Sequence, residues 1–517
     1  MKKYTKFLSA DFSASIVVFL VALPLCLGVA LGSGAPLFSG IIAGIIGGIV
    51  VGIFSGSSLS VSGPAAGLTV IVASAIIQLQ VYEAFLLAVV IAGIFQLLFG
   101  YLKAGVIGDY VPNSVIKGML AAIGLILILK QFPHLIGYDT DFEGDETFFQ
   151  IDEKNTFSEM FSAINQITPT AIILGTISLL ILIVWGTKKV QSIKILSAIP
   201  GPLVVVLFGV GMHEYIKYYQ PELQLETKHL VTLPIAENIG SFFSFFRFPD
   251  ISFLNNLTVW TSALTLAIVA SLETLLGIEA VDKIDPLKRI TPADRELKAQ
   301  GIGNIISGLI GGIPVTSVVV RSSANVTAGA KTKLATILHG MLLLICVMFI
   351  PSTLNKIPLC VLAAVLIFTG YKLVKLPLIK EFYKKGWDQF IPFIVTIIAI
   401  LLTDLLKGIV IGIIVALFYL VRSNFRSAIL VAHHENNYII RLRKDVSFLN
   451  KPIIKRQLEL LPSNSYVIID ATRADFVDKD IIEEINNFML NANTRNIHVE
   501  VKKSLRKPMH LLFNKSL

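Results

Sequence analysis

Long runs of apolar residues without a single charge recur along most of this chain. Six of them occupy residues 16–31, 84–98, 171–184, 203–210, 336–350 and 391–402. Only 15% of the 517 residues are charged, whereas a soluble protein carries roughly 25%. Several runs approach the ~20 residues that cross a bilayer as a helix, and they are apolar on all sides. We therefore predict a polytopic membrane protein whose membrane part is all-α.

The apolar runs resolve into fourteen predicted spans or half-spans. They cover residues 13–31, 37–54, 64–79, 83–100, 105–130, 169–186, 199–213, 258–277, 299–312, 320–330, 333–350, 358–373, 388–406 and 408–423. In the second span glycines repeat every four residues, a pattern that lets a neighbouring helix approach closely. They are Gly40, Gly44, Gly48, Gly52 and Gly56.

Charge in the connecting segments predicts the orientation. With the N-terminus inside, segment 131–168 falls outside, and it is strongly acidic with Lys154 as its one Lys or Arg. Segments 187–198, 282–298 and 374–387 fall inside and are rich in lysine and arginine. This distribution follows the positive-inside rule, so both termini are predicted to be cytoplasmic. It also accounts for the net charge of +9 without a nucleic-acid partner.

The composition becomes that of a soluble domain after Arg426. Strands are predicted at 438–442, 466–470 and 497–501, with helices at 451–461 and 479–491. Such βαβαβ alternation indicates a small α/β domain. We predict a transmembrane domain at 1–430 and a cytoplasmic domain at 437–517.

Two predicted spans are interrupted by glycine and proline. The first is preceded by Ser62-Gly63-Pro64 and the second by Gly311-Gly312-Ile313-Pro314, and each is the third span of its group of seven. Paired interruptions at matching positions indicate a transporter binding site. Extended backbone at membrane depth survives only where it lines a cavity or finds internal partners. A helix that starts there directs free N–H groups and partial positive charge at an anion. The alternative is a pair of merely kinked helices.

Two charged residues are predicted to lie within the membrane. Arg321 stands at the start of the second broken helix, where it would add a full positive charge to the helix dipole. Its alternatives are a structural ion pair or a side chain that reaches the cytoplasm. Glu273 lies in the eighth span and could hold a coupling cation or a proton, or pair with Arg321.

The sequence resembles the SulP family of anion transporters, which includes sulfate permeases and their bicarbonate-transporting and prestin-like relatives. The resemblance covers almost the whole chain. Its most specific parts are Ala22-Leu23-Pro24, Ser62-Gly63-Pro64 with Thr69, Glu273-Thr274-Leu275-Leu276, Gln300-Gly301-Ile302-Gly303-Asn304, and Gly311-Gly312-Ile313-Pro314 with Asn325 and Gly329.

This resemblance implies a seven-plus-seven inverted repeat, at about 1–215 and 256–425, with short strands before half-helices 3 and 10. Segments 1–4 and 8–11 would form a core and segments 5–7 and 12–14 a gate, with elevator-like movement between them. The C-terminal segment resembles a short STAS domain, which implies a homodimer. We expect a bacterial plasma (inner) membrane protein in contact with lipid.

The resemblance also implies where substrate and coupling ion bind. The anion-binding residues would be Leu25, Val29, Ala66, Thr69, Val318, Val319, Val320 and Arg321. The site for a sodium ion or proton would involve Glu273, Thr69, Ser317 and Gly277. Sodium-coupled relatives carry an aspartate and then a threonine where this chain has Glu273 and Gly277, so one oxygen ligand is lost. Leu25 replaces a glutamine common in sulfate-type members, which favours the bicarbonate-type branch.

We interpret the chain as a secondary transporter of small inorganic anions, with bicarbonate as the first candidate. Sulfate or a dicarboxylate on the same fold is one alternative, and an anion channel or motor-like protein is another. A nucleobase permease would need paired carboxylates at the site, and only Glu273 is evident. We identify no catalytic triad, metal-ligand cluster or P-loop, so no enzyme and no cofactor are predicted, nor a metal other than a sodium ion at Glu273.

Overall fold

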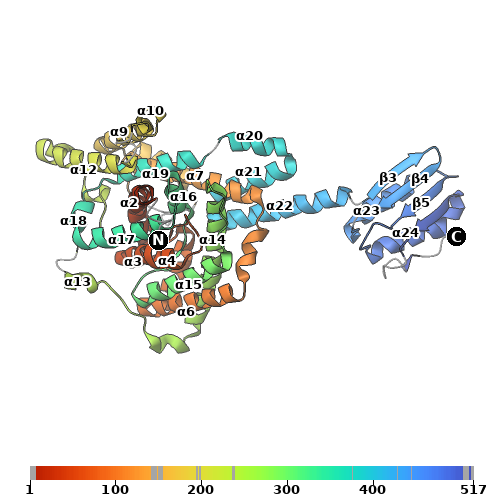
Figure 1. Cartoon of the computed structure of the whole chain (residues 1–517), viewed down its shortest axis with the longest axis horizontal. Helices are drawn as coiled ribbons and strands as arrows, with labels where there is room; N and C mark the ends of the chain where they lie inside the picture. Colours follow the sequence, from red (N-terminus) through yellow and green to blue (C-terminus); the bar gives the residue numbers. More distant parts are fainter. Residues whose placement is uncertain are drawn as a thin grey trace. The chain divides into compact units, whose positions relative to one another are not determined.

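The computed structural model describes residues 7–140, 148, 155–193, 196, 199–235, 239–374, 376–427, 429–443, 445–504 and 512–513. Most of the acidic residues of segment 131–168 lie outside these residues. The chain forms two compact units, Met1–Ile413 and Ile414–Leu517. Each unit is described by itself (Figure 1).

Helices make up the first unit, and α22 continues from it into the second. In chain order they are α2 (Leu8–Gly32), α3 (Leu37–Ile46), the π-helical turn η1 (Gly47–Val51), α4 (Gly52–Phe54), α5 (Thr69–Leu79), α6 (Tyr82–Tyr101), α7 (Asn113–Leu135), α8 (Thr156–Ile164), α9 (Pro169–Trp185), α10 (Lys188–Gln191), α12 (Gly201–Tyr219), α13 (Ile239–Phe243), α14 (Leu257–Ile284), α15 (Ala293–Leu309), α16 (Val319–Thr327), α17 (Leu334–Phe349), α18 (Pro351–Leu354), α19 (Leu359–Leu373), α20 (Leu376–Lys385), α21 (Trp387–Leu402) and α22 (Leu405–Ser427). All fourteen predicted segments coincide with helices.

Seven helices in the described part of the chain are long and apolar enough to cross a membrane. The pair α8 and α9, bent by 114°, would add an eighth if it forms one span. The other predicted segments form shorter or less apolar helices, among them α17 and α21. The structure therefore confirms a mostly helical membrane protein, while the count of fourteen crossings stays a prediction.

Glycines let the central helices approach one another closely. A Cβ added at Gly48 would lie 2.6 Å from the Cα of Gly340 in α17. The helices α6 and α15 lie side by side, and a Cβ at Gly301 would lie 2.7 Å from the carbonyl oxygen of Gly93 (Figure 1). The predicted glycine stripe of the second span therefore does mediate helix packing, as small residues do in membrane interiors.

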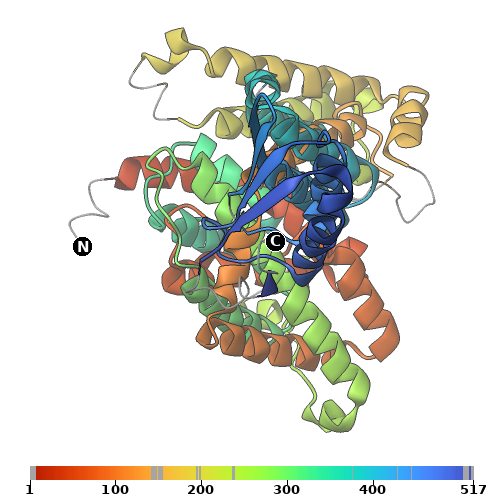
Figure 2. The same ribbon diagram turned by 90° about the vertical axis from the view of Figure 1, so that its right-hand side faces the viewer.

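The second unit contains a four-stranded sheet in the order β3 (Ile429–His434), β4 (Asn437–Leu442), β5 (Tyr466–Asp470) and β6 (His498–Lys502). The first pair is antiparallel and the others are parallel. Helices α23 (Lys451–Glu459) and α24 (Lys479–Ala492) lie beside this sheet (Figures 1 and 2). They share one hydrophobic core with Val467 and Ile469, two alternate residues of β5 that point to the same face. The predicted βαβαβ order is confirmed.

Strand β3 was not predicted, because its residues fall at the end of the predicted transmembrane domain and between the two predicted domains. It pairs with β4 through a tight hairpin in which Glu435 has a φ of 52°. That turn carries no Asn-Gly or Asp-Gly signal, so the sequence offers little to mark it.

We expect Gly48→Ala to destabilise the protein by about 1–3 kcal/mol, because the new methyl group would overlap the backbone of α17. Thermal melting of the purified protein in detergent measures the effect. Gly211→Ala is the matched control, since nothing lies within 4 Å of a Cβ at that helical glycine. Equal melting temperatures for the two variants would contradict the packing role of Gly48.

Candidate functional site

Two very short strands bring the interrupted segments together inside the first unit. Strand β1 (Ser62–Gly63) pairs antiparallel with β2 (Thr316–Ser317), so that Ser62 lies opposite Ser317 and Gly63 opposite Thr316. A 3-10 turn, Ala66–Leu68, and then α5 follow the first strand, and α16 follows the second. The two helix starts predicted to face one site are therefore joined by this strand pair.

Polar side chains pair with the extended backbone around the two strands. Asn304 of α15 makes two bonds to Val315: its Oδ1 accepts from the Val315 N–H at 2.6 Å and its Nδ2 donates to the carbonyl at 3.0 Å. The same Nδ2 donates to Oε1 of Gln96 at 2.6 Å. These partners replace the water that the backbone lacks in this interior.

Further partners come from α15, α16 and α17. The Ser322 hydroxyl accepts from the N–H of Val61 at 2.9 Å, and Asn325 donates to the carbonyl of Leu59 at 2.9 Å. Additional hydrogen bonds join Gln300 to Ser62, Thr336 to Ser60, and Val318 to Val61. The Gln300 to Asn304 motif and Asn325 thus support the broken backbone and do not line the cavity below.

The backbone N–H groups at the two helix starts precede the first hydrogen-bonded turns. In α16 the first backbone donor is Ser322, whose N–H bonds to the carbonyl of Val318 at 3.0 Å. The turn before α5 begins with a bond from Leu68 to the carbonyl of Ala65 at 3.1 Å. Residues 65–67 and 318–320 all line one cavity. Apart from Val318, whose N–H bonds to the carbonyl of Val61, they carry the orphan donors that every helix start leaves.

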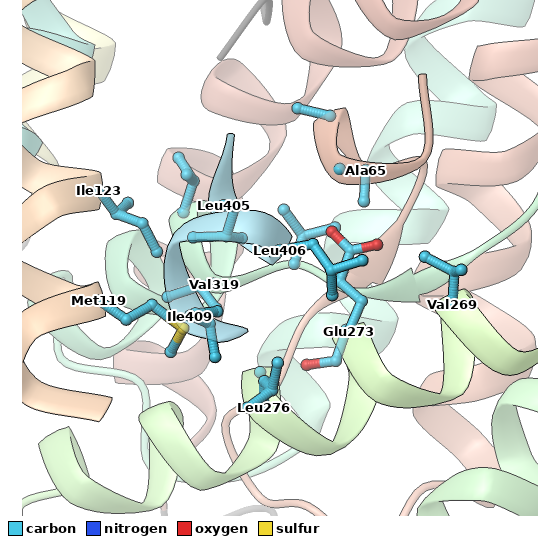
Figure 3. Close-up of a pocket in the computed structure, with 16 residues that line it drawn as sticks. Ala65, Met119, Ile123, Val269, Glu273, Leu276, Val319, Leu405, Leu406 and Ile409 are labelled. Atoms are coloured by element: carbon cyan, nitrogen blue, oxygen red, sulfur yellow. The ribbon is translucent and has the colours of Figure 1, made fainter. Parts of the chain in front are cut away.

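This cavity has a volume of about 30 Å³. A single water needs ~10–15 Å³, so the space suits a small solute. Besides the two helix starts it is lined by Ser317, by Val269, Glu273, Leu276 and Gly277 of α14, by Met119 and Ile123 of α7, and by Leu405, Leu406 and Ile409 of α22 (Figure 3). None of the described residues that line it is basic.

Glu273 places a carboxylate on the cavity wall. Its side chain extends from α14 toward the segment that contains Ala65 (Figure 3). A Cβ added at Gly67 would lie 2.8 Å from Oε1 of Glu273, so a larger residue there would displace this carboxylate from its position. The acidic group therefore lies directly beside the first helix start.

Gly277 lets α14 approach β2. A Cβ at this position would lie 2.7 Å from the carbonyl oxygen of Ser317 and 2.9 Å from its hydroxyl. The Ser317 hydroxyl is also 2.7 Å from that of Ser60. A threonine at 277 would collide with β2, so the oxygen lost there is replaced by a close contact with Ser317.

Arg321 is fully buried but does not line the cavity. One guanidinium nitrogen donates to the carbonyl of Pro64 at 3.2 Å, and the guanidinium also lies against Cys26 of α2 and Gly63. In the part of the chain that the structure describes, Arg321 forms no ion pair and its Nε and Nη1 have no hydrogen-bond partner. Its charge therefore lies on the side of the first broken segment that faces away from the cavity. The described residues give no support to the alternative of a structural ion pair.

The bond to Pro64 also orients the next N–H group. The peptide bond between Pro64 and Ala65 is trans, so its carbonyl and its N–H point in opposite directions. The carbonyl faces Arg321, which turns the N–H of Ala65 away from the guanidinium. Because Ala65 lines the cavity, the peptide that Arg321 holds is part of the cavity wall.

The other predicted residues lie further from the cavity. Leu25 and Val29 are buried in α2, and Thr69 begins α5 with a buried hydroxyl that has no hydrogen-bond partner among the described residues. The structure thus brings together Ala66, Val318, Val319, Val320, Ser317, Glu273 and Gly277. It leaves Leu25, Val29, Thr69 and Arg321 outside the lining.

Sequence reasoning missed the apolar side of the cavity, which Met119, Ile123 and the start of α22 provide. An apolar side chain that faces a cavity has the same sequence signal as one that faces lipid. It also missed Gln96, although a buried amide in an apolar span indicates a polar partner. Among the described residues, no group of three or more His, Cys, Asp or Glu is placed to hold a metal ion.

A model of the sulfate permease family matches residues 8–399. The chain belongs to this family. It is 26% identical over 438 residues to the putative sulfate transporter YvdB of Bacillus subtilis, covering 84% of this chain and 78% of the relative. It is 24% identical over 416 residues to the bicarbonate transporter BicA of Picosynechococcus, covering 78% of this chain and 69% of the relative.

Solved structures of the family share the fold. The transmembrane domain of a cyanobacterial bicarbonate transporter BicA matches with a TM-score of 0.54 at 20% identity, over 79% of this chain and 97% of that one. SLC26A9 matches with a TM-score of 0.65 at 15% identity, over 96% of this chain and 84% of that one. These likenesses establish the fold of this sulfate permease family member and leave its substrate open.

Proposed function

We propose that this sulfate permease family member is a secondary active transporter of small inorganic anions, with bicarbonate as its substrate. The observation that carries the proposal is the cavity where two helix starts, at 65–67 and 318–320, converge. Their orphan N–H groups and partial positive charges bind an anion without a basic side chain on the wall. A helix start presents N–H donors, and it does not present the carbonyl oxygens that would bind a cation.

The charges around the cavity favour a monoanion. Arg321 and Glu273 carry opposite unit charges, and each helix start contributes roughly +0.5. The sum is about one positive charge, which matches bicarbonate. Sulfate would need Glu273 to be protonated or neutralised by a cation.

Glu273 is the proposed coupling group. A proton or a sodium ion bound there would remove a negative charge that repels the anion, so that anion and cation bind together. Ser317 and Thr69 would supply the further oxygen atoms for a sodium ion, while Gly277 supplies none. This arrangement supports symport, with sodium or proton as the coupling ion.

The two sides of the cavity differ in a way that supports an elevator mechanism. The proposed core segments provide the strands, the helix starts and Glu273. The proposed gate segments provide apolar side chains from α7 and α22. An apolar wall makes no directional bonds to the site, so the core can slide past it with the anion. We further propose the seven-plus-seven topology, a homodimer, cytoplasmic termini in a bacterial inner membrane, and a STAS-like second unit.

Sulfate or a dicarboxylate is the second candidate, because the Bacillus subtilis relative is named a putative sulfate transporter. Channel-like conduction is a third. Uptake of labelled bicarbonate, sulfate and fumarate into proteoliposomes, with and without sodium and pH gradients, separates them. We expect saturable bicarbonate uptake that a sodium or proton gradient accelerates. Sulfate or fumarate uptake without bicarbonate uptake would contradict the first candidate, and gradient-independent ohmic current would contradict coupled transport.

We expect Arg321→Met to lower anion uptake at least about tenfold in kcat/KM, because it removes both the charge and the donor to Pro64. Removal of a buried, unpaired charge should not lower the melting temperature. Arg321→Lys keeps the charge but not the planar donor set, so its kcat/KM should lie between those of the wild type and Arg321→Met. Wild-type kinetics in Arg321→Met would exclude the proposed role.

We expect Glu273→Gln to abolish the dependence of uptake on the sodium or pH gradient, because the amide takes up no proton and lacks the negative charge that attracts a sodium ion. Repulsion between unit charges ~4 Å apart amounts to about 4 kcal/mol at an effective dielectric constant of 20. The variant should therefore prefer sulfate over bicarbonate at least about tenfold more than the wild type does. Glu279→Gln, six residues along the same helix and paired with Lys283, is the control that should change neither property. Retained ion dependence in Glu273→Gln would refute the assignment.

A further inference from the structure

A second cavity of the first unit is lined almost entirely by polar and basic groups. It lies where loop 55–58, the segment between α14 and α15 with the first turn of α15, and the segment between α16 and α17 meet, and its volume is about 220 Å³. Its lining consists of Ser55, Gly56, Ser57, Ser58, Arg289, Arg295, Thr332 and Lys333. The lining includes no acidic and no apolar side chain. Loop charge predicts that this side of the protein faces the cytoplasm.

One of the three cations is already neutralised. Arg289 holds Asp285 through its Nε at 2.6 Å. Burial raises the pKa of the Asp285 carboxyl, but the hydrogen bonds from Arg289 and the backbone outweigh it, and the net pKa lies below the ordinary value. Asp285 is therefore ionised at neutral pH, and it offsets the charge of Arg289.

The other two cations have no acidic partner at the cavity. Arg295 donates to the carbonyl of Phe54 at 3.1 Å, and Lys333 donates to that of Ile53 at 2.7 Å, and neither forms an ion pair among the described residues. Both bonds cap the end of α4, which accounts for one donor on each side chain. The remaining donors are left for another acceptor, since arginine has five and lysine three.

Glu296 lies beneath the loop and does not line the cavity. It is fully buried, and it accepts from the Ser55 hydroxyl at 2.5 Å and from the Gly56 N–H at 3.3 Å. Arg295 and Lys333 both line the cavity, and Glu296 does not. An anion bound between these two cations would relieve their mutual repulsion.

We infer that this cavity binds a phosphate group, carried either by a soluble phosphate compound or by the headgroup of an anionic lipid. Two cations and the hydroxyls of Ser57 and Ser58 match the charge and the acceptor oxygens of phosphate. The cavity is several times larger than the one at the helix starts, at about 220 against 30 Å³. It is a separate site, and the inference does not rest on the transport function.

A ligand in this cavity would bridge segments that support the broken helices. Loop 55–58 leads directly into β1, and Thr332 is held by Asp11 of α2, whose Oδ2 accepts from its hydroxyl at 2.5 Å. A bound phosphate group thus ties together the end of α4 and the starts of α15 and α17. It stabilises the frame on which both helix starts are mounted.

The test uses the purified full-length protein and two ligand sources. Inorganic phosphate is titrated in neutral detergent, and nanodiscs of phosphatidylcholine are compared with nanodiscs that contain increasing phosphatidylglycerol. We expect a saturable rise in melting temperature in at least one series, since a ligand that binds only the folded state stabilises it. A rise with phosphate identifies a soluble ligand, and a rise with phosphatidylglycerol alone identifies a lipid headgroup.

Ser58→Asp is the decisive variant, because it places a carboxylate in the cavity and leaves the capping bonds of Arg295 and Lys333 intact. We expect it to weaken binding at least about tenfold without lowering the melting temperature of the free protein. Arg295→Gln should weaken binding likewise. Lys298→Gln, which removes a cation of the same helix that lies over the Tyr101 ring, should not. The absence of saturable stabilisation in both series, or stabilisation that Ser58→Asp leaves unchanged, would overturn the inference.

Discussion

The antiparallel contact between β1 and β2 is the constraint on which the rest of the site depends. Four residues of extended backbone lie in an apolar interior, where each unpaired polar group costs several kcal/mol. The strand pair alone supplies few bonds, so Asn304, Ser322 and Asn325 complete them. Once the backbone is held in this way, two helices can start in mid-protein with their N–H groups directed at one small cavity. Glycines at 67 and 277 then let α14 and its carboxylate come against both starts.

Much of this was predictable, because the relevant residues contrast with their surroundings. Glycine, proline and single charges stand out in apolar spans, so the two interruptions, Glu273 and Arg321 could be found from sequence. The direction of Arg321 could not, because successive residues of a helix differ by about 100° around its axis. Val319 and Val320 face the cavity, whereas Arg321 points behind it. The apolar wall from α7 and α22 had no signal at all, because its side chains resemble those that face lipid. Strand β3 had no sequence signal for a different reason, because its turn contains no Asn-Gly or Asp-Gly pair.

The position of Arg321 also limits how strongly the site can discriminate. Backbone N–H groups and helix dipoles respond to charge and size and hardly to the identity of an oxyanion. A protein built in this way can change its preferred anion by altering the charge balance around the cavity rather than its shape. This explains how relatives named for sulfate and for bicarbonate can share the family with this chain at 26% and 24% identity. In the proposed mechanism, Glu273 is the group whose ionisation changes that balance.

The roles proposed for the two cavities account for the arginine behind the first cavity and the cations on the wall of the second. A transporter must release its substrate in every cycle, so binding at the helix starts has to remain moderate. A guanidinium in direct contact with the anion would form a charge-assisted hydrogen bond to it. In a buried cavity of about 30 Å³ the low dielectric constant would strengthen that bond and slow release of the anion. In the proposed mechanism Arg321 instead contributes through the Pro64 carbonyl, with which it forms a hydrogen bond, and Glu273 offsets its charge. The cavity at Arg295 and Lys333 has no such carboxylate on its wall. Its chemistry therefore favours retention of a ligand, which suits a site that stabilises the frame rather than one that turns over.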